Sequence, residues 1–404
     1  MYSTICLFLL VICVGGWKHD PEEDMDAYQL ISTKGYPVET HNVVTQDGYR
    51  LTLYRIPPKT STASPKSAPN KPPIVFLQHG LLMSCTCWLT NLKNQSLAYI
   101  LADEGFDVWL GNFRGTTYSR NHAYISPDSA KFWQFSWDEM ARYDLETMID
   151  YALSTSGGKQ LYYVGHSEGT LTAFAKFSDD LKFAQKIRHF FALAPVYYAK
   201  HCSGLVKVIG SQSTIIEMVL RLVGYNEFLP KSFLNKILAK LVCGSLWTDP
   251  LCTNLLFLIT GFDRTGLNST RLPVYLSHTP AGTSTQNMAH FGQLTNVNEC
   301  RRYDHGYDKN MKLYGQGTPP AYNVTNMRVP VSLYWGDKDW LADPADIAQL
   351  LTQLSSVYGN HWIQDADHVE FVWGTRAPQL IYRPIVELIH KDWTQGPLLP
   401  KHHC

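Results

Sequence analysis

The feature that most limits how this chain can fold is residues 161 to 177, which read LYYVGHSEGTLTAFAKF. An apolar run of β-forming residues leads into Gly-His-Ser-Glu-Gly, and a helix-compatible run follows directly. This order is typical of a strand, a sharp turn and a helix, with Ser167 at the turn. A serine held in a strained turn needs small neighbours, because the backbone there crowds the adjacent strand and helix. We therefore expect Gly165 and Gly169 to be sites of close backbone packing.

Short apolar runs of the same kind recur along the chain, as in strands that are buried on both faces of a parallel sheet. They are residues 74 to 78, 106 to 110, 161 to 165, 190 to 194, 331 to 335 and 361 to 364. An earlier run, residues 43 to 56, contains Asp47-Gly48, which is a hairpin signal. The sequence therefore predicts an α/β fold with a mostly parallel central sheet and an antiparallel N-terminal edge. Residues 57 to 73 are rich in proline and are expected to form a solvated loop between two strands.

Residues 198 to 322 have a different pattern, with no clear strand and with amphipathic helix patterns such as IIEMVLRLV and FLNKILAKLV. This segment is expected to be a helical insertion between two strands of the sheet. The predicted division of the chain is a signal peptide (1–16), a first part of the core (28–197), the insertion (198–322) and a second part of the core (323–395).

The first 16 residues form a short apolar run that ends in small residues, as in a secretory signal peptide. A short membrane anchor is the alternative, because no basic residue precedes the run. Elsewhere no apolar run approaches the roughly 18 residues that a membrane-spanning helix needs. Three glycosylation sequons, at Asn94, Asn268 and Asn323, support the secretory route.

Composition narrows the class of partner. The 35 Lys and Arg residues balance the 35 Asp and Glu residues, so no overall charge field draws the protein toward nucleic acid. Of nine cysteines, Cys6 and Cys13 lie in the expected signal peptide, and the odd number that remains implies an unpaired thiol or an intermolecular bridge. Cys243 and Cys252 are the favoured pair by proximity, because Cys85 and Cys87 are too close in sequence for an easy bridge.

Ser167 needs two partners to react, because a serine hydroxyl is a poor nucleophile until a histidine takes its proton and a carboxylate fixes that histidine's tautomer. In hydrolase folds the order is serine, acid, histidine, each following a strand. The run VSLYWGDKDWLADP offers Asp337, Asp339 and Asp343, and HWIQDADHVEF offers His368 after the next strand. Spacing alone leaves the three aspartates open. His361 is disfavoured as the base, because it begins its strand rather than following it.

Two backbone N–H groups are candidates to stabilise a developing oxyanion. One belongs to the helix that begins after Ser167, because its first N–H groups are free. The other comes from IVFLQHGLL, where Gly80 provides a tight turn and the N–H of Leu81 would face the serine. His79 and His166 lie close by, and we interpret both as residues that brace loops.

These residues together resemble the acid lipase family of α/β hydrolases, which includes gastric, lingual and lysosomal acid lipases and their insect relatives. The similarity runs from about residue 28 to 390 and includes the blocks GYPVETHNVVTQDGYRLTLYRIP, FLQHGLL, DVWLGNFRGTTYSRNH, WDEMARYDLETMIDY, GHSEGT, LPVYLSHTPAGTSTQNMAHF, GDKDWLADP and HVEFVWGTRAP. The resemblance implies an α/β-hydrolase fold with helices on both faces of the sheet. It also implies that the insertion is a cap and lid, which covers the site in water and opens at a lipid surface.

The resemblance assigns roles to individual residues. Ser167 corresponds to the nucleophile, Asp339 within DWLADP to the acid, and His368 to the base. The backbone amides of Leu81 and Glu168 fall where the family forms its oxyanion hole. A disulfide in the cap is implied by a further match, at Cys243 and Cys252.

The activity implied is hydrolysis of the carboxylic esters of neutral lipids, triacylglycerols or sterol esters, through an acyl-enzyme. This chemistry requires neither a cofactor nor a metal. The expected partner is a neutral lipid at a lipid–water interface, with no nucleic acid and no integral membrane segment in the mature chain. The expected location is extracellular or a gut lumen, with the lysosome as the alternative. A non-catalytic lipid carrier and a peptidase on the same fold are the competing interpretations.

Glu168 departs from the family pattern, which commonly has glutamine after the nucleophile. We hypothesise that its carboxyl favours activity at acid pH, because a carboxylate there would oppose the charge on the substrate oxygen. The alternative is a glutamate that is salt-bridged into the cap and has no effect on pH.

Overall fold

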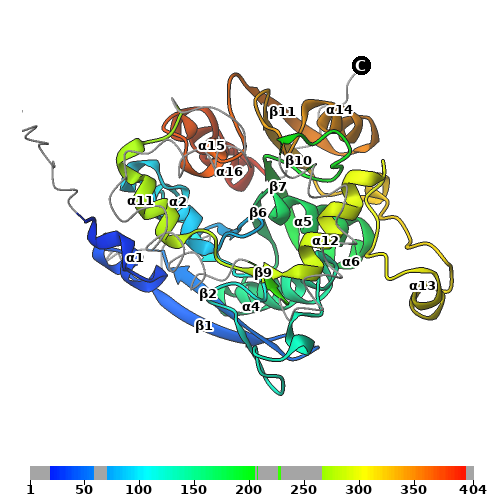
Figure 1. Ribbon diagram of the computed structural model, residues 1–404. Coiled ribbons are helices and arrows are strands. Elements are labelled where there is room, and N and C mark those ends of the chain that lie inside the picture. Colours follow the sequence, from blue (N-terminus) through cyan, green and yellow to red (C-terminus); the bar gives the residue numbers. More distant parts are fainter. Residues whose placement is uncertain (1–18, 59–70, 205–206, 208–225, 229–265, 397–404) are drawn as a thin grey trace, which may run out of the picture.

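The computed structural model describes residues 19–58, 71–204, 207, 226–228 and 266–396, and the features below refer to these residues. Their centre is a nine-stranded sheet (Figure 1). The strands run in the order β1-β2-β4-β3-β6-β7-β10-β11, and β5 pairs with β2. Their bounds are β1 Glu39–Val44, β2 Tyr49–Ile56, β3 Ile74–Gln78, β4 Asp107–Leu110, β5 Asn121–His122, β6 Leu161–His166, β7 Ile187–Leu193, β10 Val331–Gly336 and β11 Val357–Ile363.

The pairing of these strands confirms the predicted fold class. Strands β4, β3, β6, β7, β10 and β11 are mutually parallel, whereas β1, β2 and β5 form an antiparallel edge. Each predicted apolar run overlaps a strand, although β1, β7 and β11 begin three or four residues before the runs that indicated them, and β5 is the one strand of the sheet that no run predicted. The turn between β1 and β2 is at Asp47-Gly48, where Gly48 has a φ of 98° that favours glycine.

Helices cover both faces of the sheet (Figure 1). They are α1 Ala27–Thr33, α2 Leu97–Asp103, α3 Trp137–Glu139, α4 Leu145–Ser156, α5 Glu168–Asp179, α6 Leu181–Ala184, α14 Pro344–Gln353, α15 Glu370–Trp373 and α16 Arg383–Gln395. A π-helical turn, η5 (Met140–Asp144), joins α3 to α4. In Figure 1, α2, α15 and α16 lie to one side of the strands, and α5 and α6 lie to the other.

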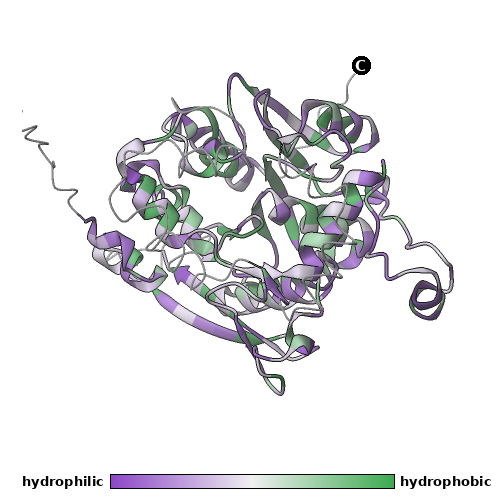
Figure 2. Cartoon of the chain, in the orientation of Figure 1, coloured by the Kyte–Doolittle hydropathy of each residue, from purple (hydrophilic) through white to green (hydrophobic). Residues whose placement is uncertain are grey.

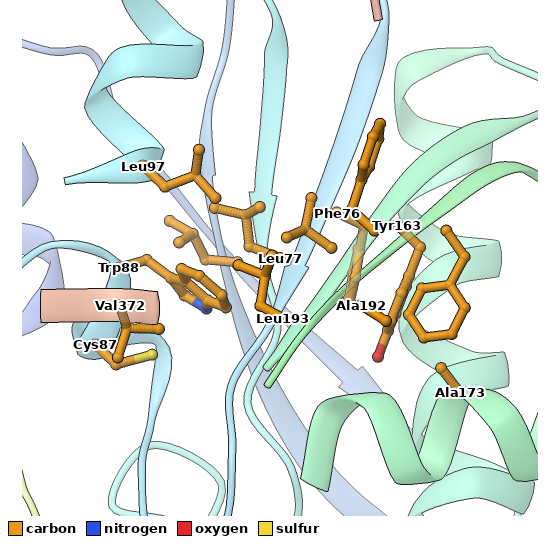
Figure 3. Packing of buried hydrophobic residues seen from close by; sticks show 14 of the residues in the cluster. Phe76, Leu77, Cys87, Trp88, Leu97, Tyr163, Ala173, Ala192, Leu193 and Val372 are labelled. Atoms are coloured by element: carbon orange, nitrogen blue, oxygen red, sulfur yellow. The ribbon is translucent and has the colours of Figure 1, made fainter. Parts of the chain in front are cut away.

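Side chains of the central strands alternate between the two faces of the sheet, and both sets pack into the core. On β6, Tyr162 donates a hydrogen bond to Asp392 of α16, whereas the next residue, Tyr163, packs its ring against Phe177 of α5. Figure 3 shows the same division, with Trp88, Leu97 and Val372 on one face and Phe76, Tyr163 and Ala173 on the other. Every residue of β3, β4 and β6 is buried, which explains their apolar runs. In Figure 2 polar colours mark the outer hairpin strand β1.

The segment between β7 and β10 contributes no strand to the central sheet among its described residues. It contains α11 (Leu272–His278), α12 (Thr285–Asn296) and α13 (Tyr307–Tyr314). The expectation that it has no strand was wrong, because β8 (Glu227–Phe228) and β9 (Thr283–Ser284) form a two-stranded sheet. These two-residue strands are too short to show a period in sequence. The two amphipathic patterns quoted above lie outside the described residues.

The expected signal peptide and most of the proline-rich loop also lie outside the described residues. Of the helices described, none is long and apolar enough to cross a bilayer. The division into core and cap at residues 198 and 322 stays a prediction.

Candidate active site

Ser167 lies at a strained turn between β6 and α5, with φ 53° and ψ −116°. Two glycines make this turn possible. A Cβ at Gly169 would lie 2.5 Å from the carbonyl oxygen of Gln78 in β3, and one at Gly165 would lie 2.7 Å from the carbonyl oxygen of Gly169. Since both obstacles are backbone atoms, no side-chain movement would relieve them. The predicted packing role of both glycines is confirmed.

Backbone strain is concentrated at one edge of the sheet. The non-glycine residues with positive φ in the described chain are Leu82, Ser167, Ala194 and Asp365. They follow β3, β6, β7 and β11 respectively, so all four lie just beyond the carboxyl ends of parallel strands. Clustered strain of this kind is typical of functional sites, where the surrounding structure holds residues in unfavourable conformations.

The structure brings Asp339 and His368 together beyond β10 and β11. His368 Nδ1 lies 2.8 Å from Asp339 Oδ2 and 3.0 Å from Oδ1. Asp339 is held in place by the N–H groups of Leu341 and Ala342, which donate to Oδ1 at 2.9 and 2.8 Å. Both side chains are buried, with 2% of Asp339 and 3% of His368 exposed. Because a carboxylate only accepts, Nδ1 carries the proton and Nε2 is left free to accept one.

Close packing of two loops produces this contact. A Cβ at Gly336 would lie 2.1 Å from the carbonyl oxygen of Ala366, and the N–H of Lys338 donates to the same oxygen at 3.2 Å. The loop after β10 therefore lies directly against the loop that carries His368.

The two other candidate aspartates have structural partners. Asp337 Oδ1 accepts from the N–H of Asp365 at 2.7 Å, and Asp343 Oδ1 accepts from the N–H of Ala345 as the N-cap of α14. The expectation that His361 begins its strand was wrong. Strand β11 begins at Val357, and His361 lies within it, stacked on Tyr334 at 4.4 Å between ring centroids.

His166 connects the serine turn to the histidine loop, which the sequence did not reveal. Its Nε2–H donates to the carbonyl oxygen of His368 at 2.9 Å, and the two ring centroids are 5.0 Å apart. Burial lowers the pKa of His166 to about 3, so this ring is neutral near pH 7.

Ser167, one residue further on, is 6% exposed. No hydrogen bond joins its hydroxyl to His368 in the described chain, and such contacts often tighten only when substrate binds.

The loop after β3 lies against Ser167. A Cβ at Gly80 would lie 2.9 Å from both Ser167 Cβ and His166 Nδ1. His79 braces this loop, because its Nδ1–H donates to the Gly80 carbonyl oxygen at 2.8 Å while Nε2 accepts from the N–H of Phe113 at 3.1 Å. Burial lowers the pKa of His79 to about 4, consistent with a neutral ring.

The candidate oxyanion donors lie on the two segments that meet at Ser167. Leu81 follows Gly80, and Glu168 is the first residue of α5. The hydrogen bonds of the described turns and caps include no donation from the N–H of Leu81 or of Glu168.

The side chain of Glu168 is buried, with 2% of the residue exposed, and its Oε1 accepts from Asn287 Nδ2 at 2.6 Å. The salt bridge that was the alternative interpretation of Glu168 is not formed, because this partner on α12 is an amide. Burial raises the pKa of the carboxyl to about 7, although the Asn287 hydrogen bond acts in the opposite direction. No local sequence signal indicates Asn287, because the residues are 119 positions apart.

A second buried carboxyl lies beside His368. Asp367 Oδ1 accepts from the N–H groups of Val369 and Glu370, at 3.1 and 3.2 Å. Burial and the nearby carboxylates of Glu370 and Asp339 raise the pKa of Asp367 to about 8. In the described ranges, no group of three or more His, Cys, Asp or Glu side chains is placed to hold a metal ion.

The remaining predicted residues differ in their exposure. Asn94 and Asn323 are exposed, and Asn268 is half-buried. Cys243 and Cys252 lie outside the described residues. Four other cysteines are buried and unpaired, namely Cys85, Cys87, Cys202 and Cys300.

The sheet order and the strained serine turn define the protein as an α/β hydrolase in fold. Residues 73–375 match the family model described as alpha/beta hydrolase fold, and residues 27–92 match the partial alpha/beta-hydrolase lipase region. The chain is 44% identical to Lipase lipl-1 of Caenorhabditis elegans, over 98% of this chain and 99% of the relative. It is 45% identical to gastric triacylglycerol lipase of Homo sapiens, over 92% of each chain. The chain therefore belongs to the acid lipase family of α/β hydrolases, as the resemblance predicted.

A solved structure supports the fold alone. A soluble variant of monoglyceride lipase from Saccharomyces cerevisiae, in complex with a substrate analog, has a TM-score of 0.52 at 13% sequence identity. The likeness covers 88% of this chain and 95% of that chain.

Proposed function

We propose that this protein is a lipase that hydrolyses the carboxylic esters of neutral lipids, triacylglycerols or sterol esters. The observation that carries the proposal is the buried Asp339–His368 pair, together with the hydrogen bond from His166, beside the strained turn of Ser167, to the loop of His368. The names of the relatives support it, since they include a gastric triacylglycerol lipase.

In the proposed mechanism, Ser167 Oγ attacks the ester carbonyl carbon while His368 Nε2 takes the hydroxyl proton. Asp339 accepts from Nδ1–H throughout, so it holds the reactive tautomer and stabilises the imidazolium that forms. The N–H groups of Leu81 and Glu168 donate to the carbonyl oxygen as it becomes negative.

The tetrahedral intermediate collapses when the C–O bond to the alcohol breaks and His368 returns its proton to the departing oxygen. An acyl group is then bonded to Ser167 Oγ. Water attacks this ester with His368 again as the base, and the fatty acid leaves as Ser167 regains its proton.

The remaining expectations form part of the proposal. Residues 198–322 would act as an apolar cap and lid that covers the site in water and opens at a lipid–water interface. The mature protein would be secreted to an extracellular space or a gut lumen, or alternatively delivered to the lysosome. Asn94, Asn268 and Asn323 would carry glycans, and Cys243 and Cys252 would form a disulfide.

Ser167→Ala tests the proposal. With triolein, cholesteryl oleate and a peptide ester assayed from pH 4 to 8, the variant should lose at least about 10⁴-fold in kcat on the lipid esters, because no nucleophile remains. Ser178→Ala is the matched control, since Ser178 lies on the same helix and its Oγ donates only to the Ala175 carbonyl oxygen, at 3.2 Å.

Binding of the lipid ester by Ser167→Ala should persist, which separates a lost reaction from a lost fold. Retained hydrolysis by Ser167→Ala would contradict the assignment of the nucleophile. If the wild type acts on the peptide ester alone, a peptidase is favoured. If the wild type binds lipid and hydrolyses no ester, a carrier is favoured.

A further inference from the structure

The proposed mechanism uses the backbone N–H of Glu168 and leaves its side chain without a role. This carboxyl is buried one residue after the nucleophile, at the first position of α5. Its Oε1 accepts from Asn287 Nδ2, and Asn287 is fully buried on α12. The hydrogen bond between α5 and α12 thus lies directly beside Ser167, the proposed nucleophile.

The orientation of the Asn287 amide is fixed by its other contacts. Its Oδ1 accepts from the N–H of Trp137 at 2.7 Å, and its Nδ2 also donates to Thr283 Oγ1 at 3.0 Å. Because a backbone N–H can only donate, the amide oxygen must face Trp137 and the amide hydrogens must face Glu168. Asn287 therefore meets the carboxyl with a donor in either charge state.

The titratable groups on the elements packed against the start of α5 are mostly acidic or neutral. They are Asp138 and Glu139 on α3, Arg142, Tyr143 and Asp144 on η5, His290 on α12, and Tyr162, Tyr163 and His166 on β6. Burial lowers the pKa of His290 to about 4 and that of His166 to about 3, so both rings are neutral near pH 7.

The buried guanidinium of Arg114 donates its hydrogen bonds to carboxylates other than Glu168. Arg114 donates to Asp144 Oδ1 from Nε at 2.8 Å and from Nη2 at 2.6 Å, and its Nη1 donates to Asp47 at 2.6 Å. The charge of Asp144 itself raises the pKa of Glu168, adding to the effect of burial. A charge on Glu168 is thus stabilised mainly by the Asn287 amide.

We propose that Glu168 is a positioning residue for ester hydrolysis, whose contact with Asn287 holds the first turn of α5 and whose neutral form supports turnover better than its carboxylate. The inference rests on the proposed function. The contact fixes the N–H that would stabilise the oxyanion, and a negative charge on the same residue opposes the charge that develops on the substrate oxygen.

The burial of Glu168 determines the direction in which turnover changes with pH. Because burial raises the pKa of Glu168 to about 7, the group is neutral below that pH and becomes charged above it. Turnover should therefore fall as the pH rises through this range. His368 must be neutral to act as base, so any loss of turnover at acid pH has a separate origin.

The test compares kcat and KM for a soluble butyrate ester between pH 5 and 9 in the wild type, Glu168→Gln and Asn287→Ala. Wild-type kcat should fall about tenfold above neutral pH, as expected for a like charge several ångströms from the oxyanion. Glu168→Gln keeps an oxygen that accepts from Asn287 and cannot ionise, so its kcat should stay level over this range with KM unchanged. Asn287→Ala removes the donor that favours the carboxylate, so the fall should move to higher pH.

An infrared difference spectrum between wild type and Glu168→Gln gives a readout that does not depend on activity. It should contain the carbonyl stretch of a protonated carboxylic acid at pH 5, and this band should be lost above neutral pH. Its absence at pH 5 would overturn the proposal.

The outcomes separate the two proposals. If Glu168→Gln loses turnover at alkaline pH as the wild type does, the inference fails, whereas loss of hydrolysis in Ser167→Ala would still support the proposed function. If the wild type hydrolyses no ester at any pH, both fail. Lower turnover in Asn287→Ala with an unshifted pH midpoint would indicate a purely structural contact and would also overturn the inference.

Discussion

At the scale of single residues, the candidate site depends on side chains whose hydrogen bonds leave them one orientation. Asp339 accepts from two backbone N–H groups at Oδ1 and faces His368 with Oδ2. His166 is neutral and donates to the carbonyl oxygen of His368. His368 is therefore held by one hydrogen bond at its ring and by another at its backbone carbonyl, which limits the rotation that would misalign Nε2.

Asp339→Asn should lower kcat by about 10⁴-fold, with little change in melting temperature. The new amide oxygen can still accept from Leu341 and Ala342, but its NH₂ group would donate to His368 Nδ1 and force the proton onto Nε2. Steady-state kinetics with a soluble ester, together with thermal melting, would measure both effects. Asp337→Asn is the matched control and should keep its activity, because Asp337 accepts from Asp365 rather than facing His368. A comparable loss in both variants would contradict the role of Asp339.

At the scale of elements, the serine turn is a point where β3, β6 and α5 pack backbone against backbone. Gly169 of α5 faces the Gln78 carbonyl oxygen of β3, and Gly165 of β6 faces Gly169. These contacts let the helix begin directly above the sheet, so that its first N–H groups face the space beside Ser167. Close packing at the turn thus orients the helix that carries a candidate oxyanion donor.

Gly169→Ala should destabilise the fold by about 1–3 kcal/mol, because the added methyl overlaps a backbone oxygen and α5 must shift. The same shift should lower kcat by moving the N–H of Glu168. Urea unfolding and ester kinetics would test the two effects. Gly105→Ala is the control: it has φ 82° but open space around it, so it should cost about 1–2 kcal/mol and leave kcat unchanged. Unaltered kcat in Gly169→Ala would show that the position of α5 does not limit turnover.

At the scale of the whole molecule, buried titratable groups of both kinds link stability to pH. Burial lowers the pKa of His79, His166, His189 and His290 to about 4, 3, 3 and 4 from a usual 6.5. The unfolded chain therefore binds protons that the folded chain does not, and stability falls as the pH falls below about 6.5. Burial raises the pKa of Asp138, Glu168 and Asp367 to about 6, 7 and 8. For these groups the folded chain retains protons that the unfolded chain releases, so stability falls as the pH rises from about 4 to 8.

The free energy of unfolding should therefore pass through a maximum between about pH 5 and 7. Urea unfolding from pH 3.5 to 8.5 would measure it. Glu168→Gln should lessen the decline on the alkaline side, because the unfolded variant gains no charge at this position. His189→Gln, far from the serine turn and bonded to Ser332 Oγ through Nε2, should lessen the decline on the acid side alone. A stability that rises steadily to pH 8.5 would contradict the raised pKa values.

Much of the architecture was predictable, because its signals are local. The apolar runs of β3 and β6 and the turn at GHSEG lie in contiguous residues. A strand that is buried on both faces has apolar residues at nearly every position, so a few neighbouring residues are enough to predict it. The order of serine, aspartate and histidine can be read along the chain. Strands β8 and β9 were missed because two residues are too few to show a period.

The sequence by itself determined the α/β class, the serine turn with its two glycines, and three aspartates as candidate partners for His368. Spacing left the three aspartates open, the family resemblance pointed to Asp339, and the structure places Asp339 against His368. Only the tertiary structure decided that His166 bonds the same loop and that the partner of Glu168 is an amide on α12. The physical reason is distance along the chain. Contacts between residues 29, 202 and 119 positions apart depend on how loops and helices pack against the assembled sheet, and no stretch of neighbouring residues encodes them.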